Sequence, residues 1–251
     1  MLARISDVLN KEIISLGSDS VNLRVEGGHK LRGSIDTKVS KNATVGLLCA
    51  ALLNRGTTTL KKVPKIEEVF RLIEVLQSIG VKVTWLDGGD VEIKPPKVLK
   101  LEDIDAKAAR RTRSIIMYLG PLMHRYKEFR LPYAGGCKLG KRTVAPHLYV
   151  LEEFGLSVDT KNNYYHVTVR KKSPKEVTLY EMGETVSENV LMAAAMTEGT
   201  TIIRNISSNY MVQDMCFFLE KLGARIEGIG TNTLTVHGVK DVEKNITYAP
   251  S

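Results

Sequence analysis

The sequence has no long hydrophobic run, few cysteines and few aromatic residues. No stretch approaches the roughly 18 uninterrupted apolar residues that a membrane-spanning helix requires, and the first residues lack the order of a secretory signal. We therefore expect a cytoplasmic protein with no membrane helix. At 251 residues and 43% hydrophobic content, the chain is long enough to bury a substantial core.

Three cysteines are an odd number, and no two of them form a C-x-x-C pair, so neither a disulfide framework nor a zinc site is indicated. We expect no metal or cofactor. Cys49 and Cys216 lie in apolar, helix-like runs and are predicted to be buried thiols. Cys137 lies instead in a glycine-rich loop.

A scarcity of aromatic residues also bears on the possible partners. The net charge of +8 favours anionic partners, but charge alone leaves open nucleic acid, a phosphorylated small molecule or an acidic protein. Aromatic residues make up 6% of the chain and do not alternate with cations along a strand. A nucleic-acid protein that stacks bases needs such a platform, so this class is the less favoured one.

One pattern occurs three times, at intervals of about 70 residues. Each copy ends in an amphipathic helix, a glycine and a strand, in the segments Arg71–Trp85, Leu148–Thr160 and Cys216–Gly228. Gly80, Gly155 and Gly223 then take the position after the helix, where a left-handed backbone favours glycine. With a further helix and strand upstream, the unit reads helix, strand, helix, strand, strand.

This alternation predicts an α/β fold in which sheets cover helices. The repeats span about 40–94, 106–170 and 177–238. Outside them we expect a helical extension at 1–20, two strands within 21–39 and a connecting segment at 239–251.

Two of the three upstream helices begin with cations, which is unfavourable at the positive end of a helix unless an anion binds there. Ser40 is a good N-cap, and Lys41 and Asn42 follow it. The second helix, from Ser114, is preceded by Lys107, Arg110, Arg111 and Arg113. The third is expected to open with Ser187-Glu188-Asn189, which suits a helix dipole unaided. The loop Gly135–Val144 adds Cys137, Lys138, Lys141 and Arg142, and these cations should lower the pKa of the thiol.

These residues carry a family resemblance. The run VEGGHKLRGSIDTKVSKNATVGLLCAALLNRGTTTLKKVPKIEEV (Val25–Val69) and the segments RSIIMYLGPL, GGCKLGKR and AMTEGTTIIRN resemble UDP-N-acetylglucosamine 1-carboxyvinyltransferases, the MurA-type enolpyruvyl transferases. The resemblance covers about residues 21–250. It implies an inside-out α/β barrel of three βαβαββ-type repeats, followed by a second domain that is missing from this chain.

The resemblance also implies roles for residues. Lys41, Asn42, Arg113 and Arg142 would bind phosphoenolpyruvate and the sugar nucleotide. Thr143, Val144 and His147, in the loop-to-helix region that follows, would also bind substrate. Cys137 matches the cysteine that fosfomycin alkylates, and it would be either the acid that protonates C3 or a residue that governs product release. Lys41, Cys137 and Arg142 would be the catalytic set. The implied reaction moves the enolpyruvyl group to the 3-hydroxyl of UDP-N-acetylglucosamine, the first committed step of peptidoglycan synthesis.

The chain departs from the family pattern in several places. The family's second domain, which supplies the base for the sugar hydroxyl, would follow the last residues, so this chain is expected to be inactive without it. Ala145 stands where the family has an aspartate near the uridine, and Thr44-Val45-Gly46 replaces Ala-Leu-Pro. Three alternatives therefore stay open: a divergent or inactive paralogue acting on another sugar nucleotide, a relative of RNA 3′-terminal phosphate cyclases, and a non-catalytic assembly partner.

Overall fold

The structure, a computed structural model, describes residues 26–35, 37, 39–135 and 143–251. The chain divides into two units, residues 1–37 and 38–251. In the first unit, the described residues form neither helix nor strand. The strand expected within 34–39 is therefore not formed at residues 34, 35, 37 and 39. A strand needs a hydrogen-bonded neighbour, and pairing with a further domain stays a prediction. The extension at 1–20 and the run at 21–25 lie outside the described residues.

The second unit contains both helices and strands. Its helical segments are α2 (Lys41–Ala50), η1 (Ala51–Leu53), α3 (Glu67–Ser78), η2 (Asp87–Gly89), η3 (Leu101–Asp103), α4 (Ala106–Arg110), η4 (Arg113–Tyr118), α5 (Leu119–Arg125), α6 (Ala145–Glu153), α7 (Glu184–Ala195) and α8 (Tyr210–Leu222). Within the described part of the chain, no helix is long and apolar enough to cross a membrane.

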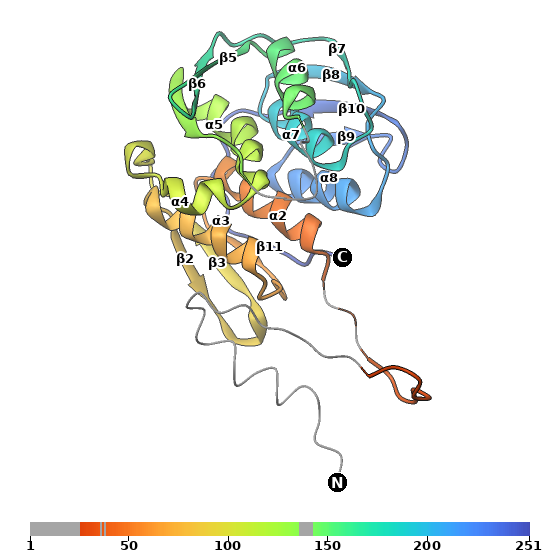
Figure 1. Cartoon of the computed structure of the whole chain (residues 1–251). Helices are drawn as coiled ribbons and strands as arrows, with labels where there is room; N and C mark the ends of the chain where they lie inside the picture. Colours follow the sequence, from red (N-terminus) through yellow and green to blue (C-terminus); the bar gives the residue numbers. More distant parts are fainter. Residues whose placement is uncertain (1–25, 36, 38, 136–142) are drawn as a thin grey trace. The chain divides into compact units, whose positions relative to one another are not determined.

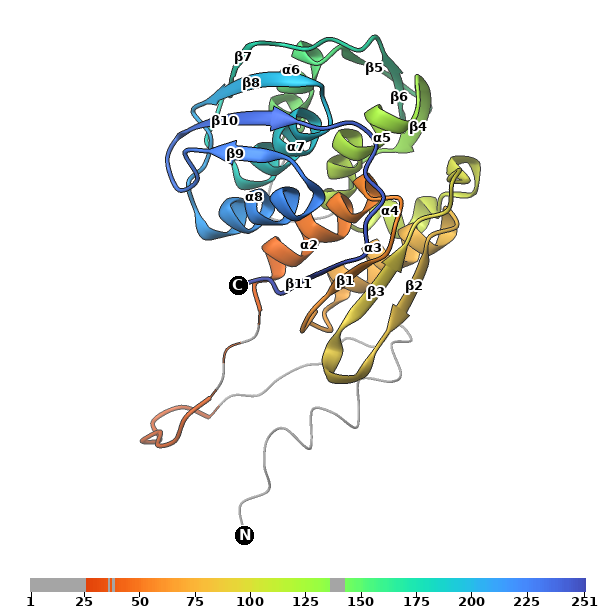
Figure 2. The same cartoon turned by 180° about the vertical axis from the view of Figure 1, so that it is seen from behind.

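Among the residues that the structure describes, eleven strands form three sheets, one for each predicted repeat. The first has the order β11-β1-β3-β2, from Ile246–Tyr248, Thr58–Leu60, Val91–Lys94 and Lys82–Trp85. The second has the order β4-β6-β5, from Glu128–Pro132, Tyr164–Val169 and Leu156–Lys161. The third has the order β7-β8-β10-β9, from Glu176–Thr178, Gly199–Arg204, Thr233–Gly238 and Arg225–Glu227. Figures 1 and 2 show the sheets on different sides of the unit, with helices between them.

Two short edge strands were missed by the sequence analysis. β7 pairs in parallel with β8, and β11 pairs in parallel with β1. The third repeat is thus a continuous β-α-β-α-β-β unit, whereas the first takes its leading strand from residues 246–248, at the other end of the chain. Part of the segment expected to be only a connection, 239–251, is therefore built into the first sheet. Three residues are too few to show the period-2 pattern of a strand.

The helices α2, α5 and α7 contact one another and form the centre of the unit. Residues 43–50 of α2 and 186–195 of α7 are all buried, so these two helices have no solvent face. A helix that is apolar on all sides must lie inside a protein. Cys49 and Cys216 are both buried, as predicted, and burial raises the pKa of each thiol, that of Cys216 to about 12.

The helices α3, α6 and α8 pack against this centre by one face. Each is followed by one of the predicted glycines, and φ is positive at all three: +90° at Gly80, +89° at Gly155 and +117° at Gly223. At Gly155 the backbone of the next hairpin also comes close, because Arg170 N donates to Gly155 O at 2.8 Å. The three helix ends are therefore confirmed.

The helix beginnings differ from expectation in two places. α7 begins at Glu184, three residues before the expected start, and Ser187, Glu188 and Asn189 are buried inside it. The second helix begins with the tighter η4 at Arg113 and becomes α5 only at Leu119. The reason is a cap: Thr112 accepts a hydrogen bond from Ser114 N and so fixes the start one residue early.

Replacing Gly155 by alanine should destabilise the unit strongly. An added Cβ would overlap the carbonyl oxygen of Arg170, in a backbone conformation that is already unfavourable for alanine. Gly80→Ala is the matched control, since its φ is also positive but the nearest atom, Pro96 Cγ, is 3.7 Å away. In urea denaturation we expect a loss of about 1–2 kcal/mol for Gly80→Ala and at least about 3 kcal/mol for Gly155→Ala. Equal losses would show that the close approach is not rigid.

Candidate anion-binding site at converging helix N-termini

Three of the predicted site residues, Lys41, Asn42 and Arg113, lie where the beginnings of three helices meet. Asn42, in the first turn of α2, donates to Glu184 Oε2 at 2.9 Å, and Glu184 is the first residue of α7. Lys41 Nζ donates to Glu68 Oε2 at 2.5 Å, and the same carboxylate accepts from Ser114 Oγ, at the start of η4, at 2.6 Å. The positive ends of α2, α7 and the η4–α5 segment therefore point to one place.

The start of α2 is set by its N-cap. Ser40 Oγ accepts a hydrogen bond from Ala43 N at 3.3 Å, and its carbonyl oxygen accepts one from Thr44 Oγ1 at 2.9 Å. No acidic residue lies in the first turn. Half of the Lys41 side chain is exposed to solvent. This end of α2 thus carries a cation and the positive end of the helix dipole. Among the described residues, Glu68 is the acid that forms an ion pair with Lys41.

The beginning of η4 holds one end of the loop that carries Cys137. Arg113 donates from its guanidinium to the carbonyl oxygen of Thr143 at 2.7 Å. Thr143 Oγ1 in turn accepts from Ala145 N, and Val144 is the N-cap residue of α6. Cys137 and Arg142 lie outside the described residues, so their roles stay predictions. Arg113 is nevertheless tied to Thr143, the described residue that follows them.

The other cations of the predicted cluster do not all face this place. Arg111 pairs with Glu67 at 2.5 Å on the surface. Arg110 and Lys107 belong to α4 rather than to the start of the second helix, and the guanidinium of Arg110 lies over the Tyr164 ring, 5.8 Å from its centroid. The cluster therefore divides, and Arg113 is the member that joins the converging helix starts.

His147 is buried, with 2% of its surface exposed, and it links α6 to α7. Its Nδ1 lies 3.2 Å from Asn189 Nδ2, and its Nε2 lies 3.4 Å from Thr185 Oγ1. Burial, followed by the charge of Arg113, lowers the pKa of His147 to about 3. The ring is therefore neutral, with Nδ1 as the acceptor, since the amide nitrogen of Asn189 can only donate. Binding of a ligand by His147 stays a prediction.

Three polar residues of this region were not singled out from the sequence. Glu68 and Glu184 accept hydrogen bonds from the predicted Lys41 and Asn42. Asn189 joins two repeats, because its Oδ1 accepts from Gly120 N at 2.9 Å and its Nδ2 donates to Ile116 O at 3.1 Å. An acid in the first turn of a helix is so common that it carries no signal by itself. These partners become visible only when the repeats are packed together.

A buried acid lies deeper between α2 and α7. Burial raises the pKa of Glu188 well above its ordinary value, and the nearby carboxyls of Glu184 and Asp214 act in the same direction. Gly46 makes room for this side chain, since a Cβ there would lie 2.7 Å from Glu188 Oε1. Burial thus favours the neutral form of Glu188 over the carboxylate beneath the helix starts.

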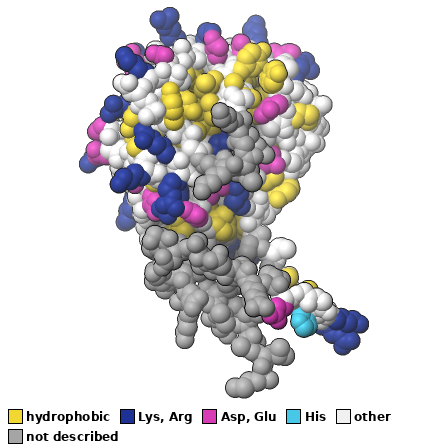
Figure 3. All heavy atoms as spheres, viewed as in Figure 1, with side chains coloured by type: hydrophobic (Ala, Val, Ile, Leu, Met, Phe, Trp, Pro, Cys, Tyr) yellow, Lys and Arg dark blue, Asp and Glu magenta, His cyan; other side chains and the backbone are white. Residues whose placement is uncertain are grey.

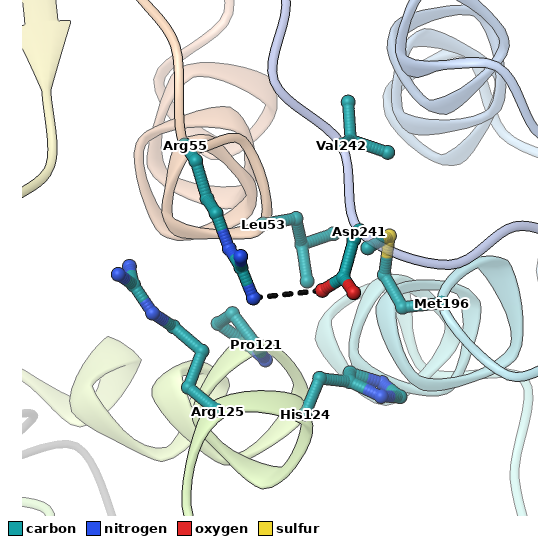
Figure 4. Close-up of a pocket in the computed structure, with 8 residues that line it drawn as sticks. All are labelled: Leu53, Arg55, Pro121, His124, Arg125, Met196, Asp241 and Val242. Carbon is teal, nitrogen blue, oxygen red and sulfur yellow. Dashed lines mark hydrogen bonds and ion pairs between the residues drawn. The ribbon is translucent and has the colours of Figure 1, made fainter. Parts of the chain in front are cut away.

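The opposite ends of the same helices meet at a small hollow (Figure 4). It is lined by Leu53, Arg55, Pro121, His124, Arg125, Met196, Asp241 and Val242. Arg125 donates to the carbonyl oxygens of Leu52, Pro96 and Lys97, and Arg55 pairs with Asp241 at 2.7 Å. Arg125 is already occupied by three carbonyl oxygens and Arg55 by a carboxylate, so the hollow is a poor site for an anion.

The surface charge is mixed on the face shown in Figure 3. Lys and Arg side chains are interspersed there with Asp and Glu, outside the atoms drawn in grey. On the molecule as a whole, some basic side chains pair directly with acids, such as Arg204 with Glu176 at 2.6 Å. This face therefore offers separate basic side chains rather than one basic stripe.

The chain is similar in sequence to known carboxyvinyltransferases. The family model for EPSP synthase (3-phosphoshikimate 1-carboxyvinyltransferase) matches residues 25–249. The UDP-N-acetylglucosamine 1-carboxyvinyltransferase of Bradyrhizobium diazoefficiens is 38% identical over 214 residues, which are 85% of this chain and 49% of that protein. The protein of that name from Treponema denticola is 35% identical over 216 residues, 86% of this chain and 50% of its own length. The chain spans about half the length of the curated relatives it matches.

Solved structures share the fold. The enolpyruvyl transferase NikO from Streptomyces tendae has a TM-score of 0.76 at 21% identity, covering 90% of this chain and 53% of its own. EPSP synthase from Acinetobacter baumannii has a TM-score of 0.66 at 18% identity, covering 86% of this chain and 49% of its own. The predicted α/β fold class is thereby confirmed, and so is the resemblance noted in the sequence.

The neutral state of His147 predicts a loss of stability in acid. Because its folded pKa is lowered to about 3, the unfolded chain binds a proton first, below a pH of about 6.5. The stability that neutral His147 contributes is therefore lost as the pH falls from about 6.5 towards 3. We measure the free energy of unfolding in urea at several pH values across this range. Its dependence on pH should be weaker for His147→Gln than for the unsubstituted chain. An unchanged slope, or an imidazole that titrates near pH 6.5 in NMR spectra, would contradict this assignment.

Proposed function

This chain belongs to the EPSP synthase family of carboxyvinyl (enolpyruvyl) transferases, and we propose that it forms one half of a site that joins phosphoenolpyruvate to a sugar nucleotide. The acceptor we propose is the 3-hydroxyl of UDP-N-acetylglucosamine, which would make the reaction the first committed step of peptidoglycan synthesis in the cytoplasm. The observation that carries the proposal is the meeting of helix N-termini with Lys41, Asn42 and Arg113.

The chemistry requires cations more than any other group. The donor carries a phosphate and a carboxylate, and negative charge must be held while the hydroxyl oxygen bonds to C2 and a proton is added to C3. The tetrahedral phospho-ketal then loses a C3 proton and inorganic phosphate, which restores the double bond. Preorganised cations and helix N-termini stabilise such charge without reorganising during the reaction.

The predicted cations, Asn42 and the predicted cysteine each have a task in this scheme. Lys41 and Arg113 would hold the phosphate and carboxylate, and Asn42 would contact the donor and the sugar nucleotide. Arg142 would add a third cation from the loop anchored at Thr143. Cys137 would protonate C3 or govern product release. The base that removes the hydroxyl proton is not among these residues, so we propose that the remaining part of the enzyme supplies it.

One substitution bears on the identity of the sugar nucleotide. Ala145 stands at the start of α6, where an aspartate would face the uridine in the resembling family. Its side chain offers no hydrogen-bond acceptor. A paralogue that uses another sugar nucleotide is therefore the second candidate, and it would use the same cations for the same donor.

Removal of the cations should weaken the binding of phosphoenolpyruvate. We expect Lys41→Ala and Arg113→Ala each to raise its dissociation constant about tenfold or more, because each removes a charge-assisted hydrogen bond. Arg204→Ala is the matched control, since it removes the same charge from an exposed ion pair with Glu176 on the third sheet. Isothermal titration at low salt, with and without UDP-N-acetylglucosamine, measures the change.

The results separate the rival classes. If all three variants bind phosphoenolpyruvate equally weakly, the loss of binding reflects net charge alone. This result would contradict the proposed site. Retention of the chain on RNA at moderate salt, without any binding of phosphoenolpyruvate, would favour a nucleic-acid protein instead. If the chain binds phosphoenolpyruvate but does not bind UDP-N-acetylglucosamine, the second candidate is favoured.

A further inference from the structure

The carboxylate of Glu68 joins groups from two other parts of the chain. Glu68 lies in the first turn of α3 and accepts hydrogen bonds from Lys41 Nζ at 2.5 Å, Thr112 Oγ1 at 3.2 Å and Ser114 Oγ at 2.6 Å. Lys41 opens α2, whereas Thr112 and Ser114 surround the start of η4. One carboxylate therefore spans the two helix starts that carry Lys41 and Arg113.

Its neighbour Glu67 gives a direct comparison. Glu67 pairs with Arg111 on the surface, where 65% and 55% of the two side chains are exposed. Such pairs contribute little, because water screens them and the long side chains lose entropy. Glu68 is only 26% exposed and has three donors. The two glutamates thus share one helical turn but differ in their degree of burial and in their partners.

Glu68 remains ionised in this environment. Burial works to raise its pKa, but hydrogen bonds from Lys41 and Ser114 outweigh burial, and the pKa of the carboxyl is lowered from its ordinary value. A fixed negative charge beside the proposed anion site opposes anion binding if charge alone is considered. Its presence there is explained only if it contributes more by orienting groups than it costs by repulsion.

We propose that Glu68 is the positioning residue of this site: its carboxylate fixes Lys41 relative to the helix start at Arg113, so that both cations meet one donor that carries two anionic groups. The inference rests on the proposed function. The ammonium of Lys41 has three N–H donors. One of them engages Glu68, which leaves two for the phosphate or carboxylate of phosphoenolpyruvate. A lysine held in this way loses less side-chain entropy when the ligand arrives.

The substitution Glu68→Gln separates orientation from charge. Glutamine keeps an acceptor for Thr112 and Ser114 but loses the charged partner of Lys41. Glu67→Gln is the matched control, with the same change in net charge one residue away. Charge alone predicts tighter binding of phosphoenolpyruvate in both variants. If Glu68 positions Lys41, phosphoenolpyruvate should bind about tenfold more weakly to Glu68→Gln, because a charge-assisted hydrogen bond contributes about this much. For Glu67→Gln, the dissociation constant of phosphoenolpyruvate should be unchanged or lower.

A second measurement does not depend on any ligand. The rate at which an amine-acylating reagent labels Lys41, followed by mass spectrometry, should rise several-fold in Glu68→Gln and stay unchanged in Glu67→Gln. If Glu68→Gln does not fold, Glu68→Asp, which keeps the charge but shortens the side chain, takes its place in both measurements. In a Lys41→Ala background, the Glu68 substitution should have no further effect on binding of phosphoenolpyruvate.

The outcomes are distinct. Tighter or unchanged binding in Glu68→Gln, or unaltered labelling of Lys41, overturns the positioning role. A further loss of binding in the Lys41→Ala background also overturns it, because Glu68 would then act on the ligand by another route. If the unsubstituted chain fails to bind phosphoenolpyruvate while labelling responds as expected, the proposed function fails and the positioning of Lys41 stands by itself.

Discussion

The packing of three central helices with their N-termini at the same end is the constraint on which the rest of the structure depends. α2 and α7 are buried on all sides, so neither can turn a polar face to water, and their unpaired backbone groups are concentrated at the two ends. Aligned helix dipoles repel one another unless charges offset them. At the other end, Arg125 donates to the carbonyl oxygen of Leu52, in η1, and to that of Pro96, in the loop after β3. At the positive ends the chain places cations as well, so balance there depends on acceptors from elsewhere.

Those acceptors explain how the site can exist without a ligand. Glu68 and Glu184 accept hydrogen bonds from Lys41 and Asn42, and burial raises the pKa of Glu188 and so favours its neutral form. The positive ends are thus held together but not saturated with negative charge. An anionic donor can add to Lys41 and Arg113 without displacing the contacts that orient them. Binding strength and helix packing are therefore coupled through the same few side chains.

The sequence predicts the parts of this arrangement that depend on local order. The glycine after each outer helix, the burial of Cys49 and Cys216 and the strand pairs of each repeat follow from residues near one another in the chain. Contacts between repeats do not. Glu68 meets Lys41 27 residues away and Ser114 46 residues away, and β11 pairs with β1 across most of the chain. The start of α7 was misplaced because Ser187, a good cap by type, instead donates to Gly183 O inside the helix.

We infer that one end of the helix bundle is prepared for anions and that the other end is not. Amide NMR spectra recorded during a titration with phosphoenolpyruvate test this difference most directly. We expect shifts at residues 41–43 and 113–114, where helices begin, and none at residues 53–55 and 124–125, where they end. Shifts confined to the Arg55 and Arg125 end, or spread evenly over exposed lysines and arginines, would contradict it.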